Sequence, residues 1–397
     1  MKIKRIIGLT LTLSIIASNI IPSYSETDSI SINSTNNYSD DVLSGTSLES
    51  KSIISSDSES LFKSTEENTV EAFSTYNIAV GDYMKLGSYW GEDILWRCVD
   101  IDENGPLMLS DKVLCIKPFD AGGANVSESH GRGMKYNGII GLGRQQNGSN
   151  YWGDSNIRDW LNSYETAGNV LWSCGNSPNK SNLNGGYNDY ADEAGFLNGF
   201  TAEERSVIKT VTQKSILDKY EYSENFASNY YSSSENIADV IGNYDEAYCE
   251  YISDKIFLLD TKQLYSVYEN LGNYYQAYPT RLCVEKSEYK YSAKYDYLNI
   301  NPDEYVCYWL RTPATSDFGN SSSISTNVRR VDVTGKVSSH WAALNTIVGV
   351  RPAFYLDENS ISILNGAGLI SNPYTLNAIT ESSEKNSDEN ILQIVDV

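Results

Sequence analysis

The sequence is poor in the residues that most often carry catalysis. It contains two histidines, His130 and His340, and neither stands in a known nucleophile or metal-ligand motif. No HExxH or GxSxG pattern occurs, so neither a metalloprotease nor a serine hydrolase of those types is indicated. Cysteines are few and far apart, without the CxxC or Cys/His spacing of a zinc cluster. We therefore predict no metal site and assign no catalytic residue.

Positive charge is also scarce. Thirty Lys and Arg residues stand against 52 Asp and Glu, which gives a formal net charge of −22. Such a surface repels phosphate backbones, so we expect no nucleic-acid partner. Glycines are frequent but lack the GxGxxG and Walker spacings, so the sequence does not predict a phosphate-binding loop either.

Long apolar runs are missing except at the N-terminus. A basic start precedes the apolar stretch 6–16, and the small residues Ser23 and Ser25 stand where a peptidase would cut after Ser25. A retained membrane helix, the alternative, would need roughly 20 apolar residues. We therefore predict a signal peptide over residues 1–25, a secreted protein that can associate with the cell surface, and no membrane span after cleavage.

Composition divides the rest of the chain into three parts. Residues 26–75 are mostly Ser, Thr, Asn, Asp and Glu, and such a segment cannot bury enough apolar surface to offset its ordering entropy. We predict a disordered acidic linker there, with a propeptide as the alternative. Residues 76–376 carry all seven tryptophans and form the predicted single globular domain. Residues 377–397 form a polar, acidic tail.

Six cysteines in a secreted chain permit three disulfides. Cys98, Cys115 and Cys307 lie in apolar strand-like runs, where a thiol can pack as a small hydrophobic group. A domain of this size does not need disulfides in order to fold. We expect at most one or two bridges, with Cys98 and Cys307 as packed thiols.

The distribution of strand and helix signals predicts an α+β domain. Strand-like runs lie at both ends, and we expect these terminal strands to share one sheet. The runs are 82–89, 94–101, 107–116, 306–311, 328–333, 336–341 and 347–356. Helices are predicted after Asp154-Ser155, after a Thr201/Glu204 capping box, and from Asp260-x-x-Gln263 to Gly272. Their predicted inward residues are Ile157, Trp160, Leu161 and Tyr164; Val207, Ile208 and Val211; and Leu264, Val267, Tyr268 and Leu271.

Several motifs in fixed order resemble a bacterial domain family of unknown function that is common in Gram-positive surface and phage-linked proteins. The pieces are Val80-Gly81-Asp82, Trp96-Arg97, Ser155-x-x-Arg158-x-Trp160-Leu161-Asn162, Phe257-Leu258-Leu259, Tyr308-Trp309-Leu310-Arg311-Thr312-Pro313 and Gly349-Val350-Arg351-Pro352-Ala353-Phe354. The last two are also distantly similar to formylglycine-generating enzymes and the C-type-lectin-like fold. That resemblance implies a twisted antiparallel sheet, few helices and long loops. It does not imply oxidase activity, because Cys307 lacks the neighbouring thiol of those copper sites.

Aromatic and charged residues provide the candidate site. A sugar-stacking platform with hydroxyl-binding groups would suit the loop aromatics, although they can equally be core and rim residues. The candidate ligand-binding residues are Trp152, Asp154, Trp309, Arg311, Asp317, His340 and Trp341. Arg158, Trp160 and Arg351 are predicted to be structural, and Arg311 is expected to serve the fold before any ligand. No cofactor is predicted. The oxygen-rich segment 120–130 lacks EF-hand spacing, so the sequence does not predict a calcium site there.

The sequence favours a secreted or surface-associated binding or adhesion module for an extracellular glycan or protein. The alternatives are a cell-surface hydrolase acting on glycan or peptide, since the abundant carboxylates leave a glycosidase pair open, and a structural surface or spore-coat component. A deep pocket with convergent carboxylates would favour the enzyme, and a shallow aromatic shelf would favour binding.

Overall fold

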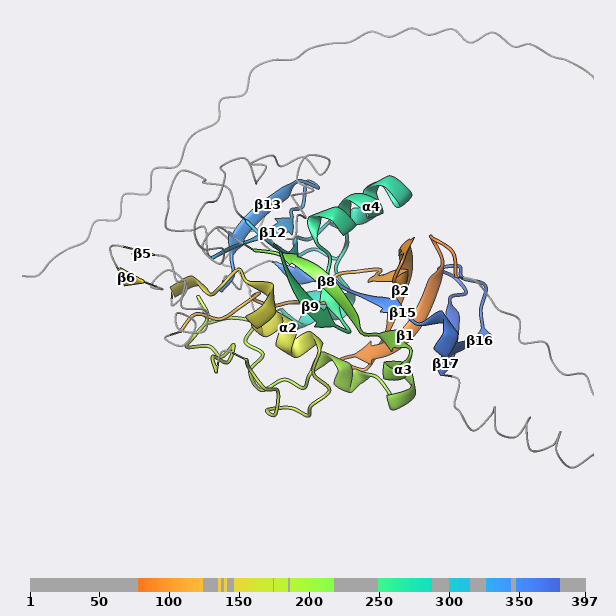
Figure 1. Cartoon of the computed structure of the whole chain (residues 1–397), viewed down its shortest axis with the longest axis horizontal. Helices are drawn as coiled ribbons and strands as arrows, with labels where there is room; N and C mark the ends of the chain where they lie inside the picture. The colour runs from red at the N-terminus through yellow and green to blue at the C-terminus, as the bar shows by residue number, and fades with distance from the viewer. Residues whose placement is uncertain are drawn as a thin grey trace, which may run out of the picture. The chain divides into compact units, whose positions relative to one another are not determined.

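The computed structural model describes residues 78–123, 135–136, 139–140, 146–173, 175–184, 186–217, 249–287, 300–314, 326–343 and 348–378. All of them belong to one unit of the chain that begins at Glu71. Strands and a few short helices make this an α+β structure (Figure 1). Within the described ranges, no helix has the length and apolar character needed to cross a membrane.

The larger sheet joins the two ends of the domain. Its order is β10-β15-β3-β2-β1-β17-β16, and β7 also pairs with β15. The strands are β1 (Tyr83–Tyr89), β2 (Glu92–Asp102), β3 (Gly105–Ser110), β7 (Ile208–Lys209), β10 (Phe257–Leu258), β15 (Pro352–Leu356), β16 (Ile361–Asn365) and β17 (Tyr374–Ala378). β1 and β17 run parallel, and the blue C-terminal strands lie beside the orange N-terminal ones in Figure 1. The expectation of one shared sheet is met in part: the predicted run 347–356 contributes β15 to this sheet, whereas the runs 306–311, 328–333 and 336–341 form strands of a second sheet.

A tight turn joins β2 to β3. Asp102 and Gly105 face each other across the hairpin end, and the Asp102 Oδ1 atom accepts the Asn104 N–H at 2.7 Å. Gly105 has φ of +107°, a conformation that a residue with a side chain rarely adopts. The glycine therefore lets the chain reverse tightly and leaves the turn's polar groups at the edge of the sheet.

The smaller sheet has the order β13-β12-β11-β14-β4. Its strands are β4 (Cys115–Ile116), β11 (Tyr308–Pro313), β12 (Asn327–Val331), β13 (Val337–Trp341) and β14 (Gly349–Val350). Two strand pairs lie outside both sheets: β5 (Lys135–Tyr136) with β6 (Ile139–Ile140), and β8 (Val211–Ile216) with β9 (Cys249–Asp254).

Two predicted strands, 107–116 and 347–356, are each divided between the two sheets. The first splits into β3 and β4, and the second into β14 and β15. Arg351 stands at the second break, and its guanidinium donates to the backbone carbonyls of Ser110 and Asp111 at the first break, at 3.0 and 3.4 Å. These hydrogen bonds connect the two positions at which the chain passes from one sheet to the other. An apolar run alone does not reveal such a break, because both halves remain buried.

The predicted helices begin where their capping residues indicate, and two of them, the first and the second, end earlier than expected. The helices are α2 (Asn156–Leu161), α3 (Ala202–Ser206), α4 (Thr261–Leu271) and α5 (Arg281–Lys286), with 3-10 turns η2 (Trp152–Asp154), η3 (Phe196–Gly199), η6 (Gly272–Tyr275) and η8 (Glu358–Ser360). Both predicted capping boxes are formed, at Thr201/Glu204 and Asp260/Gln263. Gly272 follows the last residue of α4, as predicted.

Several predicted inward positions lie outside the helices or on their exposed face. Tyr164 follows the end of α2 and is 60% exposed, and Tyr268 of α4 is 41% exposed. Val207, Ile208 and Val211 are buried as expected, but they belong to the α3 C-cap, β7 and β8. For Tyr164, Val207, Ile208 and Val211 the cause is that the helical spacing of apolar residues continues past the point where the backbone leaves the helix, whereas Tyr268 lies within α4 on its exposed face.

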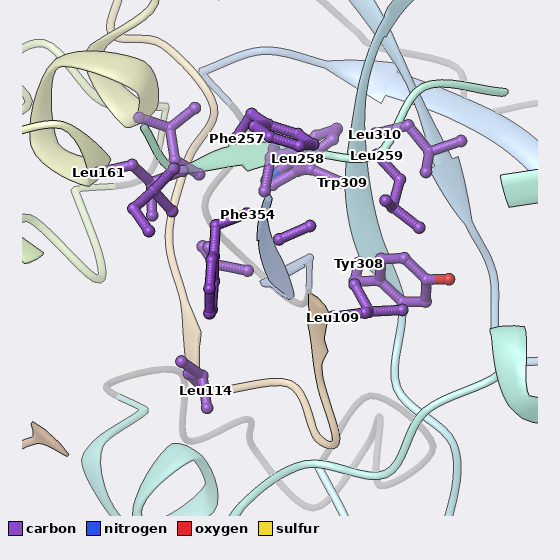
Figure 2. Packing of buried hydrophobic residues seen from close by; sticks show 14 of the residues in the cluster. Leu109, Leu114, Leu161, Phe257, Leu258, Leu259, Tyr308, Trp309, Leu310 and Phe354 are labelled. Carbon is purple, nitrogen blue, oxygen red and sulfur yellow. The ribbon is translucent and has the colours of Figure 1, made fainter. Parts of the chain in front are cut away.

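The core lies between the two sheets and α2. Figure 2 shows the side chains of Phe257, Trp309 and Phe354 packed with leucines from several elements. Phe354 also meets the Trp96 ring edge-on at a centroid separation of 4.8 Å. Trp309 and Tyr308 come from β11 and are fully buried, so this central strand of the smaller sheet packs into the core.

Candidate functional site

The structure corrects the predicted aromatic platform. Trp152 and Trp309 are 1% and 0% exposed, so neither ring face is available to a ligand. Their indole N–H groups are bonded internally, Trp152 to the Asp254 carboxylate at 2.9 Å and Trp309 to the Lys117 carbonyl at 2.8 Å. A buried Trp requires such a partner for its polar edge. Both residues serve the core.

The other predicted platform residues do not converge. Asp154 is partly buried in η2, and Asp317 lies outside the described residues. His340 and Trp341 end β13, with Trp341 40% exposed. Burial and the nearby Arg330 charge lower the His340 pKa to about 4, so His340 is neutral at physiological pH. Of the described residues in the predicted ligand set, only Arg311 lines the pocket described below.

The residues predicted to be structural have internal partners. The Arg158 Nε atom donates to the Asp254 carboxylate at 2.7 Å, and its other nitrogens bond the carbonyls of Gly153 and Ser253. Arg351 is 1% exposed and bonds four backbone carbonyls. Trp160 is buried, and its indole donates to the Ala194 carbonyl. For the oxygen-rich segment 120–130, the structure describes Asp120, a buried carboxylate that accepts backbone N–H groups of Ser149 and Asn156.

One polar cavity lies where several separate parts of the fold meet. We call it the α4 pocket, and its volume is about 490 Å³. The β2–β3 hairpin, the β8–β9 pair, the N-terminal half of α4, and the strands β11 and β15 supply its walls. The lining residues are Asp100, Asp102, Glu103, Asn104, Thr212, Gln213, Lys214, Tyr251, Asp260, Lys262, Gln263, Ser266, Arg311 and Tyr355.

Arg311 and Asp260 form the floor of the α4 pocket. The Arg311 Nη2 atom lies 2.6 Å from the Asp260 Oδ2 atom, and the two side chains are 3% and 8% exposed. The Arg311 Nη1 atom also donates to the Leu258 carbonyl at 2.8 Å and to the Gln263 Oε1 atom at 2.6 Å. Asp260 is the N-cap of α4 and accepts the Gln263 N–H at 2.7 Å. Asp260 thus belongs both to the capping box of α4 and to the ion pair that fixes the floor.

A second set of hydrogen bonds continues from the floor to the β2–β3 hairpin. The Gln263 Nε2 atom donates to Gln213 at 2.8 Å and to the Tyr355 hydroxyl at 3.3 Å, and that hydroxyl donates to Asp102 at 2.6 Å. Burial, followed by the bond to Asp102, raises the pKa of Tyr355 well above its usual value, so the phenol stays protonated. The side chains lining this wall are therefore held in fixed positions before any ligand arrives.

A sequence profile identifies the family of the domain. The profile of the domain of unknown function DUF6273 matches residues 134–358. The chain belongs to this family. The match includes β8, β9, α4, β11 and β15, and thus most walls of the α4 pocket, whereas the β2–β3 hairpin precedes it. No curated protein and no solved structure matches the chain.

The rim of the α4 pocket combines charged groups with one exposed aromatic ring. Asp100 and Glu103 come from the hairpin, and Lys214 and Lys262 come from β8 and α4. Tyr251 of β9 is 57% exposed. Among the residues that the structure describes, no three His, Cys, Asp or Glu side chains gather as a metal site would require.

Part of the α4 pocket carries a signal in the sequence. Asp260-x-x-Gln263 was predicted as a helix start, and Arg311 was predicted both as a ligand-binding candidate and as an arginine that stabilises the fold. Asp102, Gln213 and Tyr355 carry no local signal, because they lie on different strands and meet only after the sheets are paired. The polar residues of the β2–β3 turn are typical of any tight turn, so they do not indicate a binding site.

Proposed function

We propose that this DUF6273 domain is a secreted or surface-associated binding module that holds an extracellular glycan in the α4 pocket. The observation that carries the proposal is the fixed polar floor of Arg311, Asp260 and Gln263 in a cavity of about 490 Å³. Sugar hydroxyls both donate and accept hydrogen bonds, and the pocket supplies amides, carboxylates, hydroxyls and cationic groups. A protein ligand is the alternative partner.

Tyr251 supports a sugar in particular. Its exposed ring stands on β9 at the rim of the pocket, and an aromatic face with a polar tip suits the C–H face of a pyranose next to water. The pocket is polar throughout its floor, which suits a hydroxylated ligand better than an apolar one.

Secretion is part of the proposal. The N-terminal pattern of a basic start, an apolar stretch and small residues supports a signal peptide, and the acidic Ser-rich segment 26–75 supports a spacer that would separate the domain from an attachment point. The net charge of −22 suits solubility outside the cell.

We further propose that the fold is C-type-lectin-like. Support comes from the pairing of the first and last strands of the domain, the predominance of antiparallel pairs, and the small number of helices. The buried cysteines do not support the oxidase chemistry of formylglycine-generating enzymes, because burial raises the pKa of the Cys98 and Cys115 thiols to about 12.

A cell-surface hydrolase is the second candidate, favoured by one observation. Four carboxylates line the α4 pocket: Asp100, Asp102, Glu103 and Asp260. Two of them already have strong partners, since Asp260 pairs with Arg311 and Asp102 accepts the Tyr355 hydroxyl. Those two are held as parts of the floor and wall, which favours binding over turnover.

The test is a calorimetric titration of the purified chain with wall polysaccharide fragments. Tyr251→Ala should weaken binding by roughly fivefold, or about 1 kcal/mol, because a stacked ring is lost. Tyr164→Ala is the matched control, since Tyr164 is 60% exposed and does not line this pocket. No binding by the wild type, or equal loss in both variants, would contradict the proposal. Release of reducing ends by the wild type would favour the hydrolase.

A further inference from the structure

A second polar cluster lies away from the α4 pocket, beneath α2 and beside β1. Lys117 follows β4, and its side chain is 4% exposed; Glu193, 76 residues later, is 25% exposed. The Lys117 amine and the Glu193 Oε2 atom are in direct contact. Neither residue lines the α4 pocket, so this pair has no part in the proposed function.

Aromatic rings replace water around the amine. The Lys117 Nζ atom lies 4.7 Å from the centre of the Trp160 ring and 4.6 Å from that of Tyr190. An ammonium carries three N–H donors, yet within the described residues Glu193 is the one hydrogen-bond acceptor that the Lys117 Nζ atom contacts. A buried ion pair whose donors lack acceptors is costly, so a reaction that removes both charges at once is favoured at this position.

The two oxygens of Glu193 have different surroundings. The Oε1 atom accepts the Tyr89 hydroxyl and the Trp90 indole N–H, both at 3.0 Å, while Oε2 faces the amine. Two donors aimed at one oxygen stabilise the negative charge that develops there when a nucleophile adds to the carboxyl carbon. Burial, followed by nearby charges, raises the pKa of Tyr89 well above its usual value, so its hydroxyl remains a donor.

Both chain segments are held in place. The Lys117 N–H bonds the Val348 carbonyl, the Lys117 carbonyl accepts the Trp309 indole, and the Glu193 N–H bonds the Tyr190 carbonyl. The reacting groups are therefore positioned by the fold, which lowers the entropic part of the barrier.

We propose that Lys117 and Glu193 condense to a side-chain amide that crosslinks the domain. One proton passes from the ammonium to Oε2, and the Nζ atom then forms a bond to the Glu193 Cδ atom. The Cδ–Oε2 bond breaks, and Oε2 leaves as water with the second proton from nitrogen. Ammonium and carboxylate thus become one neutral amide and one water, without any oxidant or cofactor. In the product, Oε1 keeps its two donors, and the remaining N–H faces aromatic rings.

The test is the intact mass of the purified full chain under denaturing, reducing conditions, followed by tryptic digestion. The wild type should be lighter than its calculated mass by one water, and the peptides 113–132 and 181–205 should appear as one joined species. Lys85→Arg, in an exposed Lys–Asp pair, should keep the loss, and Lys117→Arg should abolish it. A wild-type chain at its calculated mass, or a water loss with these two peptides separate, overturns the proposal without requiring any variant to fold.

Discussion

At the scale of single residues, buried guanidinium groups connect distant parts of the chain. Arg311 joins β11 to the N-terminus of α4, and Arg351 joins the break between β14 and β15 to the break between β3 and β4. Arg311 donates to the Asp260 carboxylate and to the Leu258 carbonyl, and Arg351 donates to four backbone carbonyls. The motif in which each arginine stands identified both residues, but their partners depend on tertiary pairing and could not be read from the sequence.

Replacing either arginine by Ala should destabilise the domain. Arg311→Ala leaves Asp260 buried without its ion-pair partner, at a cost of about 3–5 kcal/mol. Arg351→Ala leaves several buried carbonyls without donors, at about 1–3 kcal/mol per group. Thermal unfolding should show a loss of several degrees for both. Arg281→Ala is the control, because that side chain is 63% exposed. Unchanged melting for Arg311→Ala or Arg351→Ala would contradict the structural role.

Asp159 should make stability depend on pH. Burial raises its folded-state pKa from 3.8 to about 6, although Ser173 donates two groups to it. A raised pKa means that the folded state binds the proton more tightly, so this contribution is present below pH 4 and is lost as pH rises through 6. Asp159→Asn should therefore stabilise the domain at pH 7, by about 1 kcal/mol after solvent screening.

The measurement for Asp159 is chemical denaturation at pH 4 and pH 7. The difference in stability between Asp159→Asn and wild type should be larger at pH 7. Asp93→Asn, at a carboxylate that is 67% exposed, serves as the control. An Asp159→Asn variant that is less stable than wild type at pH 7 would show that the charge of Asp159 supports the fold.

At the scale of elements, the capping residues predicted where the helices begin. The apolar runs predicted where strands lie, but they did not show where a run is divided between the two sheets. Thr201 and Asp260 specify their helix starts by local hydrogen bonds, which the sequence contains in full. The divided runs 107–116 and 347–356 stay apolar across the sheet change, because both sheets contribute to one core. The walls of the α4 pocket come from strands of both sheets and from the β8–β9 pair, and apolar runs do not show how these elements lie relative to one another, so most of the walls were not predicted.

Two glycines with similar positive φ angles provide a test of element packing. Gly87 in β1 has φ of +66°, and a Cβ there would lie 2.3 Å from the Phe200 ring. Gly272 after α4 has φ of +59°, and its Cβ would meet nothing within 4 Å. Gly272→Ala should cost about 1 kcal/mol through backbone strain alone, and Gly87→Ala should cost more because Phe200 must also move. Equal losses of melting temperature would contradict the tight packing of β1 on Phe200.

At the scale of the whole molecule, the fold does not depend on a disulfide framework. Cys98, Cys115, Cys283 and Cys307 are buried free cysteines, and Cys174 lies outside the described residues. With four of six thiols free, no more than one intramolecular bridge can form. The expectation for Cys98 and Cys307 as packed thiols is confirmed in the structure, with Cys98 in β2 and Cys307 immediately before β11.

Alkylation followed by mass spectrometry tests this distribution of thiols. Denatured but unreduced protein should be labelled at Cys98, Cys115, Cys283 and Cys307. The folded protein should react slowly at Cys98 and Cys115, because burial raises the pKa of both thiols to about 12. Three intact bridges in the denatured protein would show that secretion imposes a disulfide framework that the fold does not contain.

The claim that the α4 pocket is the ligand site is tested most directly by a crystal structure of the domain with a fragment of wall polysaccharide. The account predicts a sugar ring against Tyr251, with its hydroxyls within hydrogen-bond distance of the groups around Gln213 and Gln263. A sugar bound instead on another face, such as beside the exposed Trp341 of β13, would contradict the account, because the fixed floor of Arg311 and Asp260 would then serve the fold alone.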